Sequence, residues 1–403
     1  MVQGSAAIAG LAVACGDNRR PNSRLGVGVI GVGGHGTGHL GELLKRSQVQ
    51  VIAVADVDAT HVEAAIAMRN GLVGYRDYRD LLARPDIDAV VIATPDHWHV
   101  KASIDAANAG KHIYCEKPLT LTIAEGRTLV DVVQARGVAF QTGSQQRSFW
   151  QFQKACELVR NGGIGQLMSI ETVIPEGPFH EAVSAEPQPD TLDWDMWLGQ
   201  CAVVPYHQLR AGSTFRFFRD HGGGNITDIG AHELDIAQWG AGYDRSGPTK
   251  VRGTATYRPG NAFESPIRFD VTFTYDNGVT LRLGNTDSTW LVQFNGSDGW
   301  VKVHWDGLEA SRPEILDYEP GSGAVVLKTT QDHYDNWFDA IENGTPTIAD
   351  VEAGHRSATI CHLAYIAIDL GRELTWDPVA EQFPGDAEAN ARRSRPQRAP
   401  WNV

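Results

Sequence analysis

The stretch LGVGVIGVGGHG (residues 25–36) places a short apolar run directly before a glycine-rich turn, and it decides the fold. The apolar run has the residue types of a β-strand, and a helical stretch (residues 37–46) follows the turn. A GxGxxG pattern between strand and helix is typical of a dinucleotide-binding βαβ unit. Gly31 permits the tight turn, Gly33 lets the backbone approach a pyrophosphate, and Gly36 lets the helix pack closely on the strand.

A second apolar run, residues 49–55, ends in Asp56, twenty residues beyond Gly36. A carboxylate at this strand end accepts hydrogen bonds from both hydroxyls of an adenosine ribose and repels a 2′-phosphate. The pattern therefore predicts NAD as the cofactor, with NADP as the less favoured alternative. The N–H groups of the turn, including those of Gly34 and His35, are expected to face the phosphates.

Strand-like and helix-like stretches continue to alternate up to residue 148. Apolar runs at residues 89–93, 112–115 and 138–141 read as parallel strands, and Thr122 and Glu125 have the spacing of a helix capping box. We therefore expect a doubly wound Rossmann domain over residues 24–148, with five or six strands.

Two of these strands run into polar motifs, TPDHWH (residues 94–99) and EKP (residues 116–118), the first ahead of a helix expected from residue 100. Ligands of α/β proteins bind at such carboxyl ends of strands. We expect further cofactor contacts at Thr94, Pro95, His99, Glu116, Lys117 and Gln145.

Composition excludes several classes of function. The chain of 403 residues carries 35 Lys+Arg against 49 Asp+Glu, a net charge of −14, which argues against a nucleic-acid partner. Its five cysteines lack CxxC spacing, so neither a disulfide framework nor a zinc site is expected. His97 and His99 form an HxH pair without a third ligand at metal-site spacing. We therefore expect no metal.

Residues 1–23 differ from the rest of the chain. Residues 1–15 are small and apolar but too short to span a bilayer, and they end in Ala-Val-Ala-Cys15, which resembles a loose lipobox. A signal-like or disordered arm is expected here. It predicts a periplasmic or lipid-anchored exported protein without an integral membrane span; a cytoplasmic protein is the alternative.

Residues 149–389 change to period-two runs, several of them joined by turn pairs. We expect a substrate-binding α+β domain with a large, mainly antiparallel open sheet and helices on one face. The other face would then be free to form a homodimer or homotetramer. Residues 175–189 read as a long loop over the cleft. Residues 390–403 read as a C-terminal arm.

The spacing of Asp228, His232 and Asp235 places three ionisable groups on one face of an otherwise apolar helix, which is costly unless they line a cleft. Hydride transfer from an alcohol carbon needs a proton acceptor and a donor for the developing alkoxide. We take Lys117, Asp228 and His232 as the catalytic candidates. Weaker substrate candidates are Trp98, Arg147, Tyr206, His207, Arg216 and Asp235.

These motifs together resemble the glucose–fructose oxidoreductase / inositol dehydrogenase / MocA (Gfo/Idh/MocA) family from about residue 25 to the C-terminus. The strings ATPDHWH (residues 93–99), YCEKPL (114–119), QTGSQQR (141–147) and GGG (222–224) are similar to its often exported members. The resemblance implies that Lys117 polarises the substrate oxygen, that His232 is the general base or acid, and that Asp228 orients it. Which of Lys117 and His232 takes the proton stays open.

The resemblance implies an NAD-dependent oxidoreductase that acts on a CH–OH group of a sugar, polyol or glycoside. Some relatives are glycosidases with tightly held NAD, which oxidise, eliminate, hydrate and reduce in turn, so a glycoside hydrolase is the alternative. A third possibility is a nucleotide-sensing regulator, but a sensor has no use for the acid–base set of Lys117, Asp228 and His232.

Overall fold

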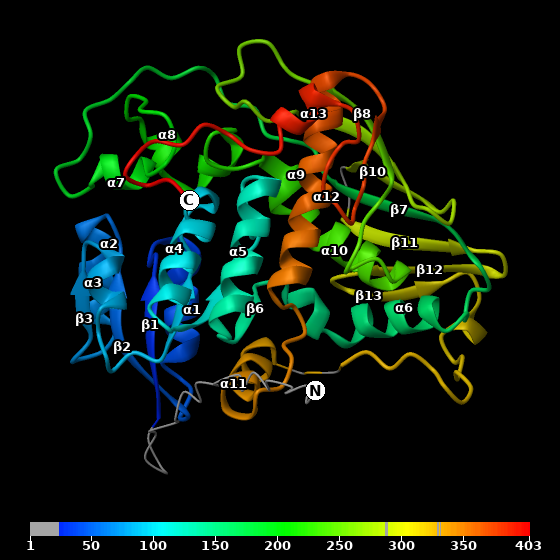
Figure 1. Ribbon diagram of the computed structural model, residues 1–403, viewed down its shortest axis with the longest axis horizontal. Coiled ribbons are helices and arrows are strands. Elements are labelled where there is room, and N and C mark those ends of the chain that lie inside the picture. Colours follow the sequence, from blue (N-terminus) through cyan, green and yellow to red (C-terminus); the bar gives the residue numbers. More distant parts are fainter. Residues whose placement is uncertain (1–23, 287–288, 329, 331) are drawn as a thin grey trace, which may run out of the picture.

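The computed structural model describes residues 24–286, 289–328, 330 and 332–403, which form two β-sheets set side by side (Figure 1). The predicted export signal and Cys15 lie outside the described residues. Within the described ranges, no helix has the length and apolar character needed to cross a bilayer.

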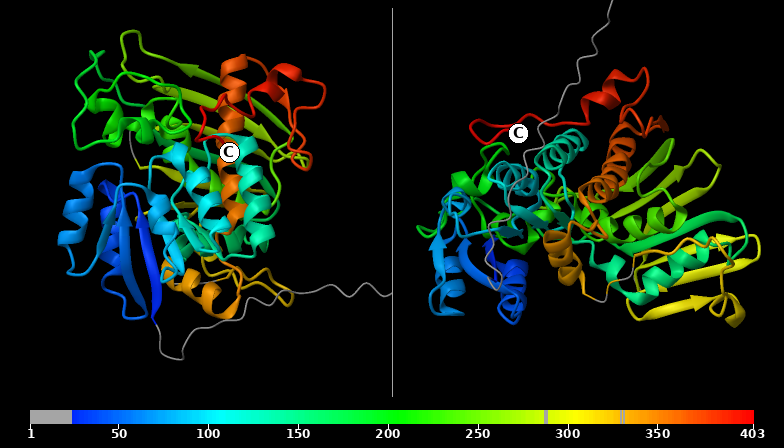
Figure 2. Two further views of the ribbon diagram at one scale, coloured as in Figure 1. Left: turned by 60° about the vertical axis from the view of Figure 1, so that its left-hand side comes forward. Right: turned by 60° about the horizontal axis from the view of Figure 1, so that its bottom comes forward.

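The first sheet is parallel throughout, in the order β3-β2-β1-β4-β5-β6, and helices cover both of its faces (Figure 2). This confirms the doubly wound sheet. Its strands are β1 (Leu25–Ile30), β2 (Val49–Ala55), β3 (Val73–Tyr75), β4 (Ala89–Ile92), β5 (His112–Cys115) and β6 (Phe140–Thr142). The helices between them are α1 (Gly34–Leu43), α2 (Ala59–Ala67), α3 (Tyr78–Leu82), α4 (Asp96–Asn108) and α5 (Ile123–Arg136).

The glycine turn after β1 depends on missing side chains. Gly31 has φ +81°, and a Cβ there would lie 2.7 Å from the carbonyl oxygen of Ala93. A Cβ on Gly36 would lie 1.8 Å from the carbonyl oxygen of Gly31, so α1 packs against the turn only because this position is glycine.

Helix α4 begins earlier than the sequence suggested. It starts at Asp96, directly after Pro95, and not at residue 100. The last four residues of the TPDHWH motif, Asp96 to His99, therefore form the first turn of a helix, and all four are buried. Proline before a helix and an acidic residue in its first turn were the available signals.

The second sheet has the order β13-β12-β11-β7-β10-β9-β8-β14. Among the described residues, its neighbouring strands pair antiparallel except β7 with β10, so the predicted mainly antiparallel sheet is confirmed. Its strands are β7 (Leu167–Pro175), β8 (Lys250–Thr256), β9 (Arg268–Thr274), β10 (Thr280–Thr286), β11 (Leu291–Gly296), β12 (Gly299–His304), β13 (Gly307–Ala310) and β14 (Leu374–Thr375).

Helices α6, α10 and α12 contact this sheet and share one large hydrophobic core with it. The helices of this half are α6 (Trp150–Arg160), α7 (Trp194–Leu198), α8 (Gln208–Ala211), α9 (Gly224–Asp228), α10 (Gly230–Ala241), α11 (His333–Asn343), α12 (Val351–Leu370) and α13 (Ala387–Ala391). Short 3₁₀ segments span Gln145–Ser148, Ser213–Phe217 and Pro313–Ile315.

Two late segments of the chain return to the first sheet. Helix α11 packs Tyr334, Trp337 and Phe338 into the core formed by β1, β2 and α1. The C-terminal arm crosses α4, where the rings of Trp401 and Trp98 are 5.4 Å apart (Figure 1). The boundaries at residues 148 and 389 stay a prediction, since packing crosses both.

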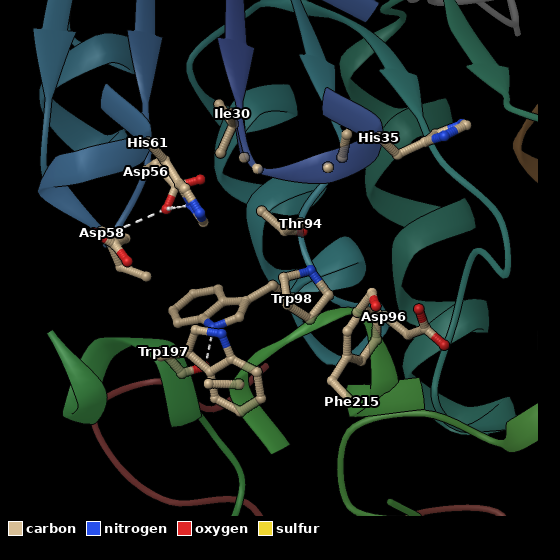
Figure 3. A pocket seen from close by; sticks show the side chains of 18 of the residues that line it. Ile30, His35, Asp56, Asp58, His61, Thr94, Asp96, Trp98, Trp197 and Phe215 are labelled. Carbon is tan, nitrogen blue, oxygen red and sulfur yellow. Dashed lines mark hydrogen bonds and ion pairs between the residues drawn. The ribbon is translucent and has the colours of Figure 1, made fainter. Parts of the chain in front are cut away.

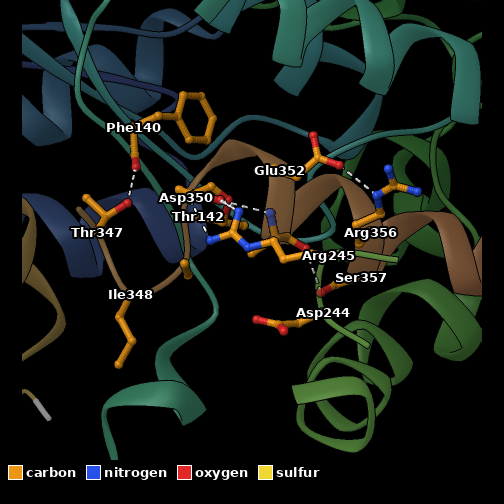
Figure 4. Close-up of polar contacts among 12 residues, drawn as sticks. Phe140, Thr142, Asp244, Arg245, Thr347, Ile348, Asp350, Glu352, Arg356 and Ser357 are labelled. Carbon is orange, nitrogen blue, oxygen red and sulfur yellow. Dashed lines mark hydrogen bonds and ion pairs between the residues drawn. The ribbon is translucent and has the colours of Figure 1, made fainter. Parts of the chain in front are cut away.

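The segment between α11 and α12 ties the two sheets together (Figure 4). The Thr347 hydroxyl donates to the carbonyl oxygen of Phe140, at 2.6 Å, in the first sheet. Arg245, which follows α10, pairs with Asp350 at 2.6 Å. These contacts fix the relative position of the two halves.

An ion-pair network joins α5 to α12. Arg127 pairs with Glu352 and with Glu381, each at 2.8 Å, and Arg356 pairs with Glu352 at 2.7 Å. Burial alone would raise the pKa of Glu352, but the hydrogen bonds from the two guanidinium groups outweigh it and lower that pKa to about 2. The network therefore stabilises the folded chain while Glu352 is ionised.

We expect Arg127→Met to lower the free energy of unfolding near neutral pH by about 1.5–3 kcal/mol, because charged hydrogen bonds of this size are lost. A carboxylate with a lowered folded-state pKa contributes its full stability above the unfolded value of 4.5 and loses it as the pH falls towards about 2. The difference between variant and wild type should shrink over that window in urea titrations. Arg136→Met is the control: it removes an arginine from the same helix whose side chain makes an exposed hydrogen bond to Asn108. A pH-independent difference would contradict the assignment.

Candidate active site

A cavity of about 410 Å³ lies at the carboxyl ends of β1, β2 and β4 (Figure 3). The glycine turn and the strand ends form one wall, and residues 189–216 of the second half form the other. Asp56 and His61 lie at one end of the labelled set and Asp96 at the other, with Thr94 between them. This is the place where open α/β sheets bind their ligands.

The glycine turn leaves room for a phosphate group. Gly31, Gly33 and Gly34 line the cavity, and a Cβ on Gly34 would meet nothing within 4 Å. The buried Thr94 hydroxyl oxygen has no hydrogen-bond partner among the described residues and belongs to the same wall. Unfilled space over backbone N–H groups at the start of a helix fits the pyrophosphate of a dinucleotide.

Asp56 stands at the end of β2 as predicted and lines the cavity. Its carboxylate accepts hydrogen bonds from the N–H groups of Val32 and Asp58, each at 2.9 Å. The ring of His61 lies 3.3 Å from it, and this hydrogen bond raises the pKa of His61. His61 and Asp58 were missed by the sequence analysis, because α2 carries no motif that marks them.

Lys117 brings the two halves of the chain together. Its ammonium nitrogen donates to the Asp228 carboxylate at 2.7 Å and to the Asp228 carbonyl oxygen at 3.0 Å. The guanidinium of Arg216 lies 3.3 Å from the other carboxylate oxygen of Asp228. All three residues line the cavity, so one carboxylate holds two cations at its wall.

Charge at this cluster is set by burial and by the two cations. Burial would raise the pKa of Asp228, but Lys117 and Arg216 outweigh it and hold that pKa below the usual range. Burial, reinforced by the charge of Lys117, lowers the pKa of His232 to about 3. Asp228 is therefore ionised and His232 neutral near pH 7.

Asp228 and His232 do not share one continuous helix. Asp228 ends α9, and His232 lies in the first turn of α10. His232 does not line the cavity, and its Nδ1 atom is buried without a hydrogen-bond partner among the described residues. The charges of Lys117 and Asp228 both act on the pKa of His232.

Asp96 is a cavity residue that the sequence analysis passed over. It is buried, and burial together with the nearby charge of Asp228 raises its pKa to about 8. Its Oδ2 atom has no hydrogen-bond partner in the described part of the chain. The misplaced start of α4 hid this residue.

Arg147 and Asp235, two of the substrate candidates, do not line the cavity. The guanidinium binds both carboxylate oxygens of Asp235, at 2.6 and 2.7 Å, and reaches Asp244 at 3.3 Å. The Arg147 and Asp235 side chains are each only 2% exposed. The structure gives them a buried ion pair in place of the expected substrate contact, because Asp235 turns towards α12, where the Ser357 hydroxyl also donates to it.

We expect Arg147→Met to destabilise the fold by about 3–5 kcal/mol, because it leaves the Asp235 charge buried without a partner. The double variant Arg147→Met/Asp235→Leu removes both charges and should recover most of that loss. Denaturant unfolding of the three proteins measures both effects. If Arg147→Met had wild-type stability and a raised KM, that result would instead support the expected contact between Arg147 and the substrate.

The remaining predicted residues divide into two groups. Trp98, His99, Tyr206, Arg216, His35 and Glu116 line the cavity. His207 and Gln145 do not: His207 caps α8 by accepting from the Arg210 N–H at 3.1 Å, and Gln145 donates to Glu116 at 3.2 Å. Trp98 donates from its ring nitrogen to the Trp197 carbonyl oxygen at 3.0 Å, which joins the two walls.

Glu116 is the centre of a second polar cluster at the same strand end. His39 lies 3.0 Å and His35 3.7 Å from its carboxylate. Burial would raise the pKa of Glu116, but the hydrogen bond from His39 and the neighbouring charges lower it well below the usual range. His39 had no marker in the sequence beyond its place in α1.

His99 links the two polar strand ends. One ring nitrogen lies 2.7 Å from the Pro118 carbonyl oxygen and the other 2.9 Å from that of Thr94. Burial lowers the pKa of His99, so a neutral ring donates to one of these two oxygens. The contact holds the TP and EKP motifs together.

Comparison with known proteins agrees with this geometry. Residues 25–144 match the model "Oxidoreductase family, NAD-binding Rossmann fold", and residues 179–403 match "Oxidoreductase family, C-terminal alpha/beta domain", both of the Gfo/Idh/MocA group. The rhizopine catabolism protein MocA of Rhizobium meliloti is 26% identical over 85% of this chain and 94% of its own length.

An inositol 2-dehydrogenase of Salmonella typhimurium is 31% identical, but the match covers 40% of this chain and 50% of that enzyme. Among solved structures, the WlbA dehydrogenase of Bordetella pertussis, determined with NADH and UDP-GlcNAcA, aligns with a TM-score of 0.68 at 18% identity, over 88% of this chain and 99% of that one. Likeness at this identity supports the fold. With the family match over most of its length and the glycine turn, Lys117 and Asp228 at one cavity, the chain belongs to the Gfo/Idh/MocA family of NAD-binding oxidoreductases.

Proposed function

We propose that this protein transfers a hydride between NAD and a hydroxyl-bearing carbon of a sugar, polyol or glycoside. One observation carries the proposal: the Lys117 ammonium, paired with Asp228 at 2.7 Å, lies in the wall of the cavity that also contains the glycine turn and Asp56. A dehydrogenase needs a proton-bearing group and a dinucleotide site facing the same space.

The chain's own residues divide the work of holding the cofactor. Gly31, Gly33 and Gly34 accommodate the pyrophosphate, and Asp56 accepts hydrogen bonds from the adenosine ribose, which favours NAD over NADP. The bound nicotinamide supplies the acceptor or donor of the hydride. Related proteins whose names include inositol dehydrogenase make a polyol or sugar the first substrate class to test.

Lys117 polarises the substrate oxygen and moves its proton. An ammonium group has three donors, and among the described residues two of them are directed at Asp228. The third is left for a substrate oxygen. Asp228, held ionised by its two cations, keeps Lys117 oriented towards the cavity.

His232 is assigned a different part. A ring with a pKa of about 3 is neutral near pH 7, and a neutral imidazole is a poor proton donor, so His232 is not assigned as the general acid in the direction of reduction. We assign the proton transfer to Lys117, and a neutral hydrogen-bonding and orienting role to His232. This is our proposal for the choice between Lys117 and His232 that the sequence left open.

The test is mass spectrometry of the nucleotide released from protein purified without additions, followed by NADH formation with a panel of polyols, sugars and glycosides. NAD(H) in the protein and net NADH from one substrate class support the proposal. NADP(H) as the sole nucleotide would contradict the role of Asp56. Cleavage of a nitrophenyl glycoside without net NADH would replace the dehydrogenase by the glycosidase alternative.

We also propose the exported location and a homodimer or homotetramer through the second sheet. The apolar residues 1–15 support the first, and the exposed residues that alternate with buried ones along β8 and β9 support the second. Cell fractionation of the full-length protein and light scattering after gel filtration test them. Protein confined to the cytoplasm, or a monomer, would contradict the respective proposal.

A further inference from the structure

We propose that His97, Cys201 and His221 bind one transition-metal ion, zinc being the best match, which fastens the segment 194–224 to α4. The three residues come from separate places: the first turn of α4, the turn after α7, and the loop before α9. Their potential ligand atoms all lie within 4.8 Å of one another. The three residues are 1%, 7% and 0% exposed.

The hydrogen bonds of His97 leave one of its nitrogens free to bind a metal. Its Nε2 atom lies 2.8 Å from the Trp197 carbonyl oxygen, and only a nitrogen that carries the proton can donate to it. The lone pair is then on Nδ1, which is buried without a hydrogen-bond partner in the described ranges. Histidines that bind metals usually donate from the other ring nitrogen in this way.

His221 gives the strongest evidence that the cluster binds an ion. Both of its ring nitrogens are buried, and neither has a hydrogen-bond partner within the described residues. A buried polar atom without a hydrogen-bond partner destabilises the folded state. Coordination of one nitrogen to an ion removes much of this cost.

Cys201 supplies the third ligand atom. Its thiol is buried, and among the described residues its one hydrogen bond goes to the Asp220 carbonyl oxygen, at 2.9 Å. On binding, the thiol loses its proton to solvent and binds as thiolate. Two imidazoles and one thiolate suit Zn²⁺, which prefers four ligands in a tetrahedron.

Gln200, the neighbour of Cys201 in the chain, carries our candidate for the fourth ligand atom. The side-chain oxygen of Gln200 is buried and has no partner in the described part of the chain. The amide nitrogen of the same side chain donates to the His97 carbonyl oxygen, which holds Gln200 beside α4. This amide oxygen or a water molecule would complete the tetrahedron.

The site would act on the cofactor cavity through Trp197. The Trp197 ring is 5.2 Å from that of His97 and 4.9 Å from that of His221, between ring centres, and the same residue lines the cavity. An ion that fixes both histidines therefore also fixes part of the wall opposite the glycine turn. The proposal differs from the sequence-based expectation of no metal. That expectation considered His97 together with His99, whereas the structure places His97 beside Cys201 and His221, which are distant in the sequence.

The first test is elemental analysis of the full-length protein after incubation with zinc and dialysis. We expect one zinc per chain in the wild type, and loss of the metal in Cys201→Ser and His221→Asn. Cys361→Ser changes another buried cysteine, one that donates to the Ser357 carbonyl oxygen, and should keep the zinc. A folded wild-type protein that retains no zinc overturns the proposal.

Cobalt substitution gives a readout that does not depend on activity. Co²⁺ in the wild type should show a thiolate-to-metal charge-transfer absorption, and Cys201→Ser should lack it. The same absorption in Cys201→Ser would place the metal elsewhere and overturn the assignment. Lys117→Ala should keep its zinc, because Lys117 is not part of the metal cluster. Zinc content therefore tests the metal site separately from the proposed oxidoreductase function.

Discussion

Lys117→Ala is expected to lower kcat by about 10²- to 10⁴-fold while NAD still binds, because it removes the proton-bearing group and leaves the glycine turn intact. The size of the effect follows from the geometry. Lys117 is the residue that joins Asp228 to the strand end beside the cofactor cavity, and its ammonium points two donors at that carboxylate. Steady-state rates and NAD titration by fluorescence measure the two quantities separately.

The matched control is Lys101→Ala. Lys101 also belongs to the first half of the chain and pairs with an aspartate, Asp105 at 2.7 Å, but it does not line the cavity. It should keep full turnover. If Lys117→Ala retained wild-type kcat, or lost NAD binding and turnover in equal measure, the assignment of proton transfer to Lys117 would fail.

Asp56→Asn is expected to weaken NAD binding by about 10- to 100-fold, since a charged hydrogen bond contributes about 1.5–3 kcal/mol. The loss of the negative charge should at the same time remove the repulsion of a 2′-phosphate, so the preference for NAD over NADP falls. Asparagine keeps the shape of the side chain and an acceptor for one of the two N–H groups, those of Val32 and Asp58, that donate to Asp56. Equilibrium binding of both nucleotides is the measurement.

Asp58→Asn is the control for this change. Asp58 lines the same cavity, but its carboxylate caps α2 by accepting from the Thr60 N–H at 2.9 Å. We expect it to leave the NAD-to-NADP ratio unchanged. An unchanged ratio in Asp56→Asn as well would show that another residue selects the nucleotide.

Local features were predictable from the sequence wherever the signal is short in range. The glycine turn follows β1 as expected, and Thr122 and Glu125 form the predicted capping box at the start of α5. The predicted strand at residues 112–115 has the observed bounds. Each of these depends on neighbours within one turn or on a simple period.

The failures concern contacts between residues far apart in the chain. Nothing in the local pattern of Arg147 shows that Asp235 lies opposite it, and nothing near His97 points to Cys201 or His221. The parallel pairing of β7 with β10 is of the same kind, because hairpin turns predict only antiparallel neighbours. Tertiary packing decides all of these.

The most direct test of the central claim uses a substrate from the panel that carries deuterium on the carbon to be oxidised. The account predicts that the deuterium appears in NADH, which becomes heavier by one mass unit, and that Lys117→Ala slows this transfer. Deuterium that never enters the nucleotide, in a protein that still converts the substrate, would contradict it.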